Sequence, residues 1–255
     1  MADSPAAHAA VQYAGTDRRL AARIVLHQRY STNRQGWFDW LAERLPLSGD
    51  VLEVGAGTGA LWAYAGTAAL GSLTLVDFSA AMAARLAGVP GGRVVRGDAT
   101  RLPFAPASFD TVIANHMLYH LDDPAAGLRE FARVLRPGGR LAVTTNGAGH
   151  LRELDALGPA IGRPDLRLEG RLANFTAESA PALVGAVFTG VAAQRYPDDL
   201  RVPVVEPVLA YLESLADTPL TTAERAAATA LVRARIDATG TFQIGKHSVL
   251  VTATA

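Results

Sequence analysis

Five short apolar runs alternate with helical stretches between residues 50 and 147, and this alternation restricts the fold more than any other feature of the sequence. Nearly continuous apolar strands separated by helices are typical of a parallel sheet with both faces covered. The sequence therefore predicts an α/β fold built on a doubly wound sheet. Sheets of this kind bind ligands at the carboxyl ends of their strands. The five runs are Val51-Leu-Glu-Val54, Leu73-Thr-Leu-Val76, Val94-Val95, Thr111-Val-Ile-Ala114 and Leu141-Ala-Val-Thr-Thr145.

The segments on either side of these runs are expected to cover the ligand-binding edge. Residues 1–45 are expected to form a helical lid, interrupted around residues 30–36, and residues 46–255 the main domain. Within that domain we expect an insertion at about 148–175 and helices at about 204–238, which together shape a substrate pocket. A helix is also expected at 177–185, and strands at 188–195 and 242–253. The last of these strands is unusually polar at its start, so its register stays open.

Charge and cysteine content exclude several classes of partner. The 24 Lys and Arg residues balance 24 Asp and Glu residues without any basic block, which argues against nucleic acid and anionic membranes as partners. Cysteine is absent, which excludes disulfides and thiolate metal sites. No apolar stretch approaches the roughly 18 residues of a membrane span, and no signal peptide is recognisable. We expect a cytoplasmic protein that acts on a small molecule and needs no metal; the sequence does not indicate an oligomeric state.

A glycine-rich loop, Gly55-Ala-Gly-Thr-Gly59, follows the first apolar run directly. Glycine permits positive φ angles and lets backbone N–H groups approach a ligand where a side chain would clash. With Ala60 in place of the third glycine, the loop also satisfies the degenerate dinucleotide motif. The loop alone is therefore compatible with both a nicotinamide dinucleotide and S-adenosylmethionine.

Three acids near the ends of three successive strands favour the second cofactor. Glu53 lies within an apolar strand, where an unpaired charge is costly, and an ammonium suits it better than a pyrophosphate does. Asp77 ends the second strand and is placed to accept both hydroxyls of a ribose. Asp98 follows the third strand and would accept from an exocyclic amine beside Leu102-Pro-Phe104. A helix cap at Asp77 and an Asx turn at Asp98 are the structural alternatives.

In order and spacing, these blocks resemble the class I S-adenosylmethionine-dependent methyltransferases, in particular the small-molecule (type 11-like) group. The resemblance covers residues 45 to 147 and implies a Rossmann-like sheet of seven strands with an antiparallel last strand. It also implies that the methionine moiety lies near Glu53, the ribose on Asp77, and the adenine near Phe78 and Asp98 to Ala99. The implied cofactor-binding residues are Glu53, Gly55, Ala56, Gly57, Gly59, Asp77, Phe78, Met82, Asp98, Ala99 and Asn115. The remaining blocks are Ser108-Phe-Asp110, Asn115-His-Met-Leu-Tyr-His120 and Val134-Leu-Arg-Pro-Gly-Gly139.

His116 is the favoured candidate for a catalytic residue. A sulfonium methyl is already activated, so the main task of the protein is to align nucleophile, methyl and sulfur. A general base is needed only for a poorly acidic hydroxyl or an ammonium, and histidine suits that role. His116 follows Asn115 at the end of the fourth strand. His120 and His150 are alternatives, and hydrogen bonding within the loop is the structural alternative for all three.

The N-terminal segment, which precedes the glycine loop, contains several aromatic and basic residues. Segments of this kind fold over the cofactor in many relatives and exclude water. Arg34 is expected to meet the cofactor carboxylate, and Tyr13 or Tyr30 to line the methyl site. His150 is grouped with them as a substrate or lid residue. For Trp37, Phe38, Trp40 and Leu41 we favour a helix that packs its apolar face on the sheet.

Two further polar blocks are interpreted as structural. Asp122-Asp123-Pro124 resembles a metal-binding acid pair near His120, but Asp followed by Pro is also the start of a helix, which we favour. Residues 135–139 are interpreted as a helix stop and turn without chemistry.

The expected function is methyl transfer from S-adenosylmethionine to a small-molecule acceptor in secondary metabolism, with O, N and C acceptors all open. The alternatives are an enzyme of the same fold that catalyses a non-methylating step, a nicotinamide oxidoreductase, and a non-catalytic cofactor-binding subunit.

Overall fold

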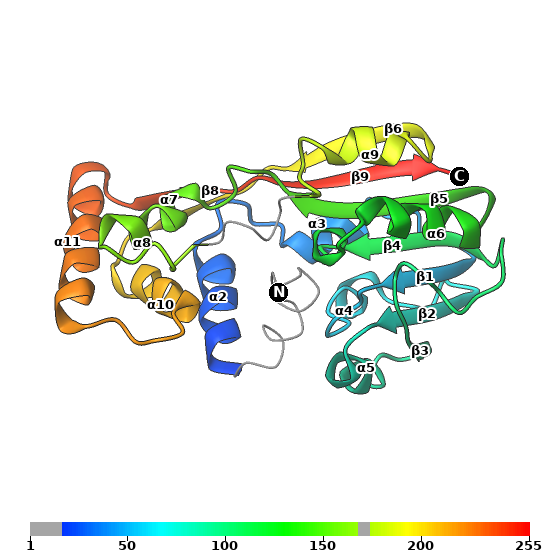
Figure 1. Cartoon of the computed structure of the whole chain (residues 1–255), viewed down its shortest axis with the longest axis horizontal. Helices are drawn as coiled ribbons and strands as arrows, with labels where there is room; N and C mark the ends of the chain where they lie inside the picture. The colour runs from blue at the N-terminus through cyan, green and yellow to red at the C-terminus, as the bar shows by residue number, and fades with distance from the viewer. Residues whose placement is uncertain (1–16, 168–173) are drawn as a thin grey trace.

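The core of the protein is a seven-stranded sheet with strand order β3-β2-β1-β4-β5-β9-β6 (Figure 1). The structure is a computed structural model that describes residues 17–167 and 174–255. Neighbouring strands from β3 to β5 are parallel, whereas β9 is antiparallel to both β5 and β6. The predicted doubly wound sheet with an antiparallel last strand is confirmed. The strands are β1 Asp50–Val54, β2 Ser72–Asp77, β3 Gly92–Arg96, β4 Phe109–Asn115, β5 Leu135–Asn146, β6 Thr189–Tyr196 and β9 Ser248–Thr254.

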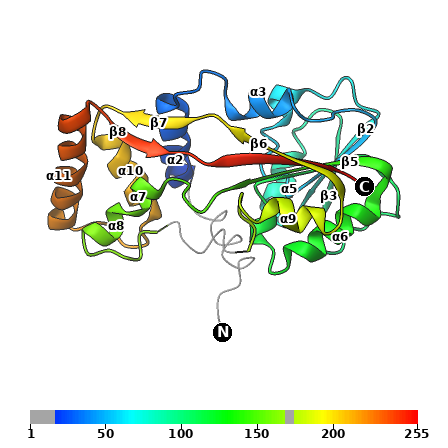
Figure 2. The same ribbon diagram turned by 90° about the horizontal axis from the view of Figure 1, so that it is seen from above.

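Helices cover both faces of this sheet, with α3 on one side and α6 and α9 on the other (Figure 2). Helix α4 shares the buried cluster of α3 and lies on the same side. Alternate residues of each strand point to opposite faces, so Val51 and Leu52 of β1 belong to two different clusters of buried side chains. Trp40, Leu41 and Trp62 fill one cluster, which confirms that the apolar face of α3 packs on the sheet. The helices are α3 Trp37–Ala42, α4 Trp62–Ala65, α5 Ala80–Leu86, the 3₁₀ turn η1 Leu118–His120, α6 Pro124–Val134 and α9 Ala180–Gly185.

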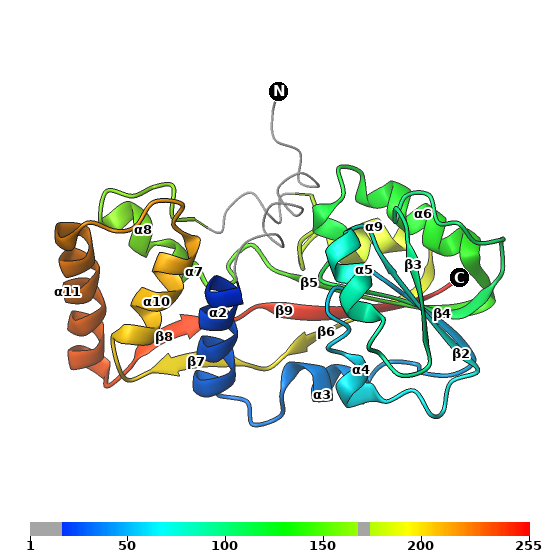
Figure 3. The ribbon, with the colours of Figure 1, turned by 90° about the horizontal axis from the view of Figure 1, so that it is seen from below.

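A second, smaller body, here called the helical lobe, lies beyond the end of the sheet at which β6 leaves it and β9 enters it (Figure 3). Strand β6 continues into β7 and strand β8 continues into β9, so a two-stranded ribbon carries the chain out of the sheet and back. Helices pack around this ribbon on a core of their own that includes Leu26, Leu154, Leu209 and Phe242. The lobe consists of α2 Asp17–Tyr30, α7 Arg152–Asp155, α8 Leu157–Ala160, β7 Asp199–Val202, α10 Glu206–Leu215, α11 Thr222–Thr239 and β8 Phe242–Gly245.

Local signals fix where several helices begin. Asp123 caps α6 by accepting from the backbone N–H of Ala126 at 3.1 Å, and Pro124 occupies the first turn, so the predicted helix start is confirmed. Ser79 caps α5 by accepting from the backbone N–H of Met82. Thr221 and Glu224 form a capping box at the start of α11.

Three expectations differ from the structure in detail. The single strand expected at 242–253 is two strands, because the chain bends at Lys246 and His247 between β8 and β9. Residues 135–139, expected to be a turn, are the first part of β5. The first N-terminal helix, α2, packs against α10 in the helical lobe, where the Arg23 guanidinium donates to Ser214 Oγ at 2.9 Å. The division of the chain at residue 45 stays a prediction.

No helix within the described ranges is both long and apolar enough to cross a membrane.

Candidate cofactor and acceptor site

The glycine loop turns sharply between β1 and α4 with positive φ angles at its three glycines. These angles are 68° at Gly55, 58° at Gly57 and 73° at Gly59. A Cβ atom at Gly55 would lie 2.6 Å from Cβ of Met117, so this position has no room for a side chain. A Cβ atom at Gly57 would meet nothing within 4 Å. The loop therefore presents its backbone to open space at Gly57, as a ligand-binding loop requires.

Glu53 is buried beneath this loop, with 2% of its surface exposed. Its Oε2 accepts a hydrogen bond of 2.6 Å from Nε1 of Trp62, the first residue of α4. Burial raises the pKa of Glu53 to about 8; the Trp62 bond opposes this rise and the nearby Asp77 charge adds to it. The partner is thus a neutral indole, and the cation that the sequence analysis expected beside Glu53 is left for a ligand to supply.

Asp77, at the end of β2, holds the glycine loop in place. Its Oδ2 accepts from the backbone N–H of Gly57 at 2.9 Å, and its Oδ1 accepts from the backbone N–H of Ser79 at 2.8 Å. Phe78, the next residue, has 62% of its surface exposed. A carboxylate and an exposed aromatic ring therefore lie together at the carboxyl edge of the sheet, where the ribose and adenine were expected.

The remaining adenine-site candidates serve local structure as well. Asp98 Oδ1 accepts from both the backbone N–H and the hydroxyl of Thr100, each at 2.8 Å, so the Asx-turn alternative is present in the structure. Met82, Ala99 and Ala56 are buried. Cofactor contact by these four residues stays a prediction.

Asn115 and His116 end β4 beside the loop. Asn115 Oδ1 accepts from the Thr144 hydroxyl at 2.6 Å, and the Thr144 Oγ1 accepts from the backbone N–H of His116 at 2.9 Å. His116 adopts a φ of 53°, which is rare for residues other than glycine. This backbone directs the imidazole toward Trp37, with a ring-centroid distance of 5.2 Å. Nδ1 of His116 and Nε1 of Trp37 are both buried without a hydrogen-bond partner.

Burial lowers the pKa of His116 to about 4, with smaller contributions from Lys246 and His120. Burial also lowers the pKa of His27 to about 4, and it holds the pKa of His150 well below the usual value for histidine. All three imidazoles are therefore neutral at pH 7. A neutral imidazole accepts a hydrogen bond or a proton at its free nitrogen.

A buried ion pair, absent from the sequence analysis, joins the sheet to the helical lobe. Lys246, the only lysine of the chain, pairs with Asp198 and lies over the Tyr196 ring at 5.2 Å. Asp198 Oδ1 also accepts from the Ser31 hydroxyl at 2.7 Å and from the backbone N–H of Thr32 at 2.9 Å. The polar start of the strand expected at 242–253, which includes Lys246, was the sign of this pair in the sequence.

His150 and His247 complete a polar group near this ion pair. His150 Nδ1 accepts from the backbone N–H of His247 at 3.1 Å, and the His247 Nδ1 lies 3.4 Å from Glu178 Oε1. His27 makes an edge contact with Tyr211 at 6.4 Å. Three imidazoles therefore lie at the junction between sheet and lobe: His247 between β8 and β9, His150 shortly after β5, and His27 of α2.

The predicted lid residues are placed differently from one another. Tyr30 is half-buried and packs against the core of the helical lobe, with the Arg29 guanidinium 5.7 Å from its ring centroid. Arg34 is exposed. Tyr13 lies outside the described residues. Their proposed contacts with cofactor or acceptor stay predictions.

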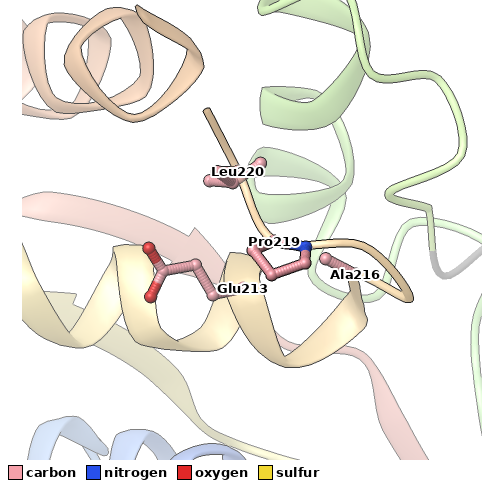
Figure 4. Close-up of a pocket in the computed structure, with 4 residues that line it drawn as sticks. All are labelled: Glu213, Ala216, Pro219 and Leu220. Carbon is pink, nitrogen blue, oxygen red and sulfur yellow. The ribbon is translucent and has the colours of Figure 1, made fainter. Parts of the chain in front are cut away.

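Two other features carry no chemistry. An open hollow at the end of α10 is lined by Glu213, Ala216, Pro219 and Leu220 (Figure 4), and its one ionisable side chain, Glu213, pairs with Arg225. This hollow belongs to the helical lobe and contains none of the residues around the glycine loop. Across the described ranges, no three His, Cys, Asp or Glu side chains come together as metal ligands.

Comparison with known proteins agrees with this geometry. Residues 52–143 match the family model described as a methyltransferase domain. A demethylmenaquinone methyltransferase of Mycolicibacterium vanbaalenii is 47% identical over 105 residues, which are 40% of this chain and 44% of that protein. The chain therefore spans less than half of the length of this relative.

Solved structures share the whole fold at low sequence identity. An S-adenosylmethionine-dependent methyltransferase from Thermotoga maritima superposes with a TM-score of 0.55 at 19% identity, covering 92% of this chain and 94% of that one. The [4+2]-cyclase SpnF superposes with a TM-score of 0.53 at 21% identity, covering 93% and 95%. At these identities the likeness is one of fold.

Proposed function

Since residues 52–143 match the model of the methyltransferase-domain family, whose members use S-adenosylmethionine, we propose that the whole chain transfers the methyl group of this cofactor to a small-molecule acceptor. One observation carries the proposal beyond the family match. Glu53 is a buried carboxyl without a cationic partner directly beneath the glycine loop. The ammonium of an amino-acid-like cofactor supplies the missing charge, which a dinucleotide pyrophosphate does not.

The residues present fit this cofactor along the carboxyl edge of β1, β2 and β4. The open backbone at Gly57 and the carboxyl of Glu53 would hold the methionine moiety. Asp77 would accept from the ribose hydroxyls, and the exposed ring of Phe78 would cover the adenine. Asn115 would lie at the methyl end of the cofactor, where β4 stops.

The bound cofactor supplies an activated sulfonium methyl group. The protein has to align the acceptor with it, exclude water and remove a proton where the acceptor carries one. His116 is neutral, and its Nδ1 is free to take that proton. Loss of the sulfonium charge accompanies protonation of His116, so the net charge of the buried site does not change during transfer. This balance offsets the burial that makes His116 a weak base in the resting protein.

The methyl acceptor of the curated relatives is no part of this proposal. The identity to the Mycolicibacterium vanbaalenii enzyme covers only 40% of this chain, so it supports a shared cofactor domain. An acceptor from secondary metabolism, enclosed between the sheet edge and the helical lobe, is part of our proposal. The low pKa of the imidazoles around this junction keeps them neutral, so they can accept hydrogen bonds. This favours a substrate that donates a hydrogen bond to the protein.

Titration calorimetry of the full chain with S-adenosylhomocysteine and, separately, with NAD tests the cofactor assignment. We expect S-adenosylhomocysteine to bind and NAD not to bind, and the reverse result would favour an oxidoreductase.

Turnover with S-adenosylmethionine distinguishes the remaining alternatives. A methyltransferase forms S-adenosylhomocysteine in step with its product. Because the [4+2]-cyclase SpnF shares this fold, product without S-adenosylhomocysteine would identify a non-methylating enzyme. Cofactor binding without turnover across an acceptor screen would indicate a non-catalytic subunit.

A further inference from the structure

Two unpartnered polar atoms belong to contacting rings beside Asn115. Within the described ranges, three buried side-chain nitrogen or oxygen atoms lack a hydrogen-bond partner: Trp37 Nε1, His116 Nδ1 and Asn174 Oδ1. The first two belong to rings in contact, with centroids 5.2 Å apart and planes at 43°. Buried polar atoms are nearly always paired in folded proteins. Two unpaired atoms on adjacent rings therefore indicate that a bound molecule pairs them.

The position of these rings points to the acceptor. His116 follows Asn115 at the end of β4, and the next residue, Met117, packs directly on Gly55 of the glycine loop. Trp37 begins α3 and also contacts Tyr196 edge-on at 5.2 Å. The two free nitrogens thus lie next to the proposed methyl site among aromatic rings, which suit a flat, largely apolar acceptor.

We propose that Nε1 of Trp37 and Nδ1 of His116 bind one hydroxyl group of the acceptor, so that the methylated atom is oxygen. This inference rests on the proposed methyl transfer and adds the chemical class of the acceptor. An indole N–H only donates, and a neutral imidazole accepts at its free nitrogen. A hydroxyl donates its proton to His116 and accepts from Trp37 with one lone pair. Its second lone pair remains for the methyl carbon.

Other nucleophiles do not satisfy both atoms. A neutral amine has a single lone pair, which cannot accept from Trp37 and attack the methyl group at once. A carbon atom itself offers neither the donor nor the acceptor, so a carbon nucleophile pairs the two nitrogens only through a hydroxyl on a neighbouring atom, and the methylated product distinguishes the two cases. In the reaction an O–C bond forms, the S–C bond breaks with its electron pair left on sulfur, and the hydroxyl proton passes to Nδ1 of His116. Trp37 is thereby a specificity residue and His116 the base.

The test follows the indole N–H signals of the ¹⁵N-labelled full-length protein by NMR. The chain has three tryptophans, Trp37, Trp40 and Trp62, and the Trp37 signal is identified by its loss in Trp37→Phe. The protein is first saturated with S-adenosylhomocysteine. Matched probes are then added: 1-naphthol, 1-naphthylamine and 1-methylnaphthalene.

We expect 1-naphthol alone to move the Trp37 N–H signal downfield, as a new hydrogen bond does. The Trp62 signal, whose N–H is already bonded to Glu53, serves as the internal control. In Trp37→Phe the affinity for 1-naphthol should fall by about tenfold, the size of one hydrogen bond to a buried group. The affinity for 1-methylnaphthalene should not fall, which separates loss of the hydrogen bond from loss of the fold.

Four results would overturn the assignment. Three concern binding: an equal shift with 1-naphthylamine, failure of 1-naphthol to bind the saturated protein, and movement of the Trp37 signal to its bonded position by S-adenosylhomocysteine alone. The fourth concerns turnover: conversion of 1-naphthol with S-adenosylmethionine to 2-methyl-1-naphthol in place of 1-methoxynaphthalene. If S-adenosylhomocysteine does not bind at all, the proposed function fails first. If it binds and 1-naphthol gives one of these results, the hydroxyl assignment alone is wrong.

Discussion

Binding of S-adenosylhomocysteine at pH 7 is expected to release nearly one proton from Glu53. This carboxyl is buried, its partner is the neutral Trp62 indole, and burial raises its pKa to about 8. A ligand ammonium beside it favours the charged form and returns the pKa toward its ordinary range. The proton that Glu53 holds in the free protein must then leave for the solvent.

The size of the effect follows from the raised pKa. With a pKa of about 8, about nine in ten Glu53 carboxyls are protonated at pH 7, so about 0.9 proton is released per ligand bound. The same shift acts on stability, because the native state holds a proton that the unfolded state, with a pKa of 4.5, has lost. The protonated Glu53 makes its full contribution to stability below pH 4.5, and this contribution is lost as the pH rises to about 8. The loss at pH 7 is about 3 kcal/mol.

Calorimetry in two buffers of different ionisation enthalpy, phosphate and Tris, measures the proton number. Wild-type protein should release about 0.9 proton at pH 7. Glu53→Gln keeps an acceptor for Trp62 but has no proton to lose, so its release should be near zero and its affinity lower. Glu43→Gln, a change at an exposed carboxyl, should behave as wild type.

Equal binding heats of wild-type protein in the two buffers, or undiminished release in Glu53→Gln, would show that Glu53 does not meet the cofactor ammonium. Urea unfolding at pH 5 and pH 8 examines the same pKa without ligand. There the free energy of unfolding should decline more steeply with pH for wild type than for Glu53→Gln.

Asp77→Ala removes the ribose acceptor and the bond to the glycine loop, and calorimetry should show S-adenosylhomocysteine affinity weakened by about 2–4 kcal/mol; unchanged affinity would reject the assignment. His116→Ala should lower kcat far more than affinity, and the wild-type pH–rate profile should be level through pH 6.5 because the pKa of His116 is about 4; an inflection near pH 6.5 absent from the variant would contradict this environment. Neutral His27 stabilises the fold above pH 6.5, and up to about 3 kcal/mol should be lost as the pH falls to 4, a decline that urea unfolding should find reduced in His27→Gln. Lys246→Met leaves Asp198 buried without its cation and should cost about 3 kcal/mol in urea unfolding, whereas a cost near zero would show that the surrounding donors suffice.

The sequence predicted the parts of the fold that rest on local signals. The alternating apolar runs identified the sheet, and the glycines and strand-end acids identified its ligand-binding edge. Asp123 followed by Pro124 marked the start of α6 because a cap is a contact between neighbours in sequence. These features depend on residues a few positions apart, which a single sequence displays directly.

The features that escaped prediction depend on distant contacts. Asp198 meets Lys246 and the backbone of Thr32, which are 48 and 166 residues away along the chain. Trp37 was expected only to pack, because nothing in its neighbourhood indicates that His116 would stand against its ring. The partner of Glu53 was also missed, although Trp62 lies only nine residues away, because the glycine loop folds back to bring them together.

The position of β9 has a consequence for how the chain folds. This strand lies between β5 and β6 in the sheet, yet its residues, Ser248–Thr254, follow those of the other strands along the sequence. Before β9 is in place, β6 has no neighbour in the sheet, and the ribbon that carries the helical lobe has no anchor on one side. A single late strand therefore completes both bodies of the protein. Deletion of residues 248–254 should consequently destabilise the sheet and the helical lobe together.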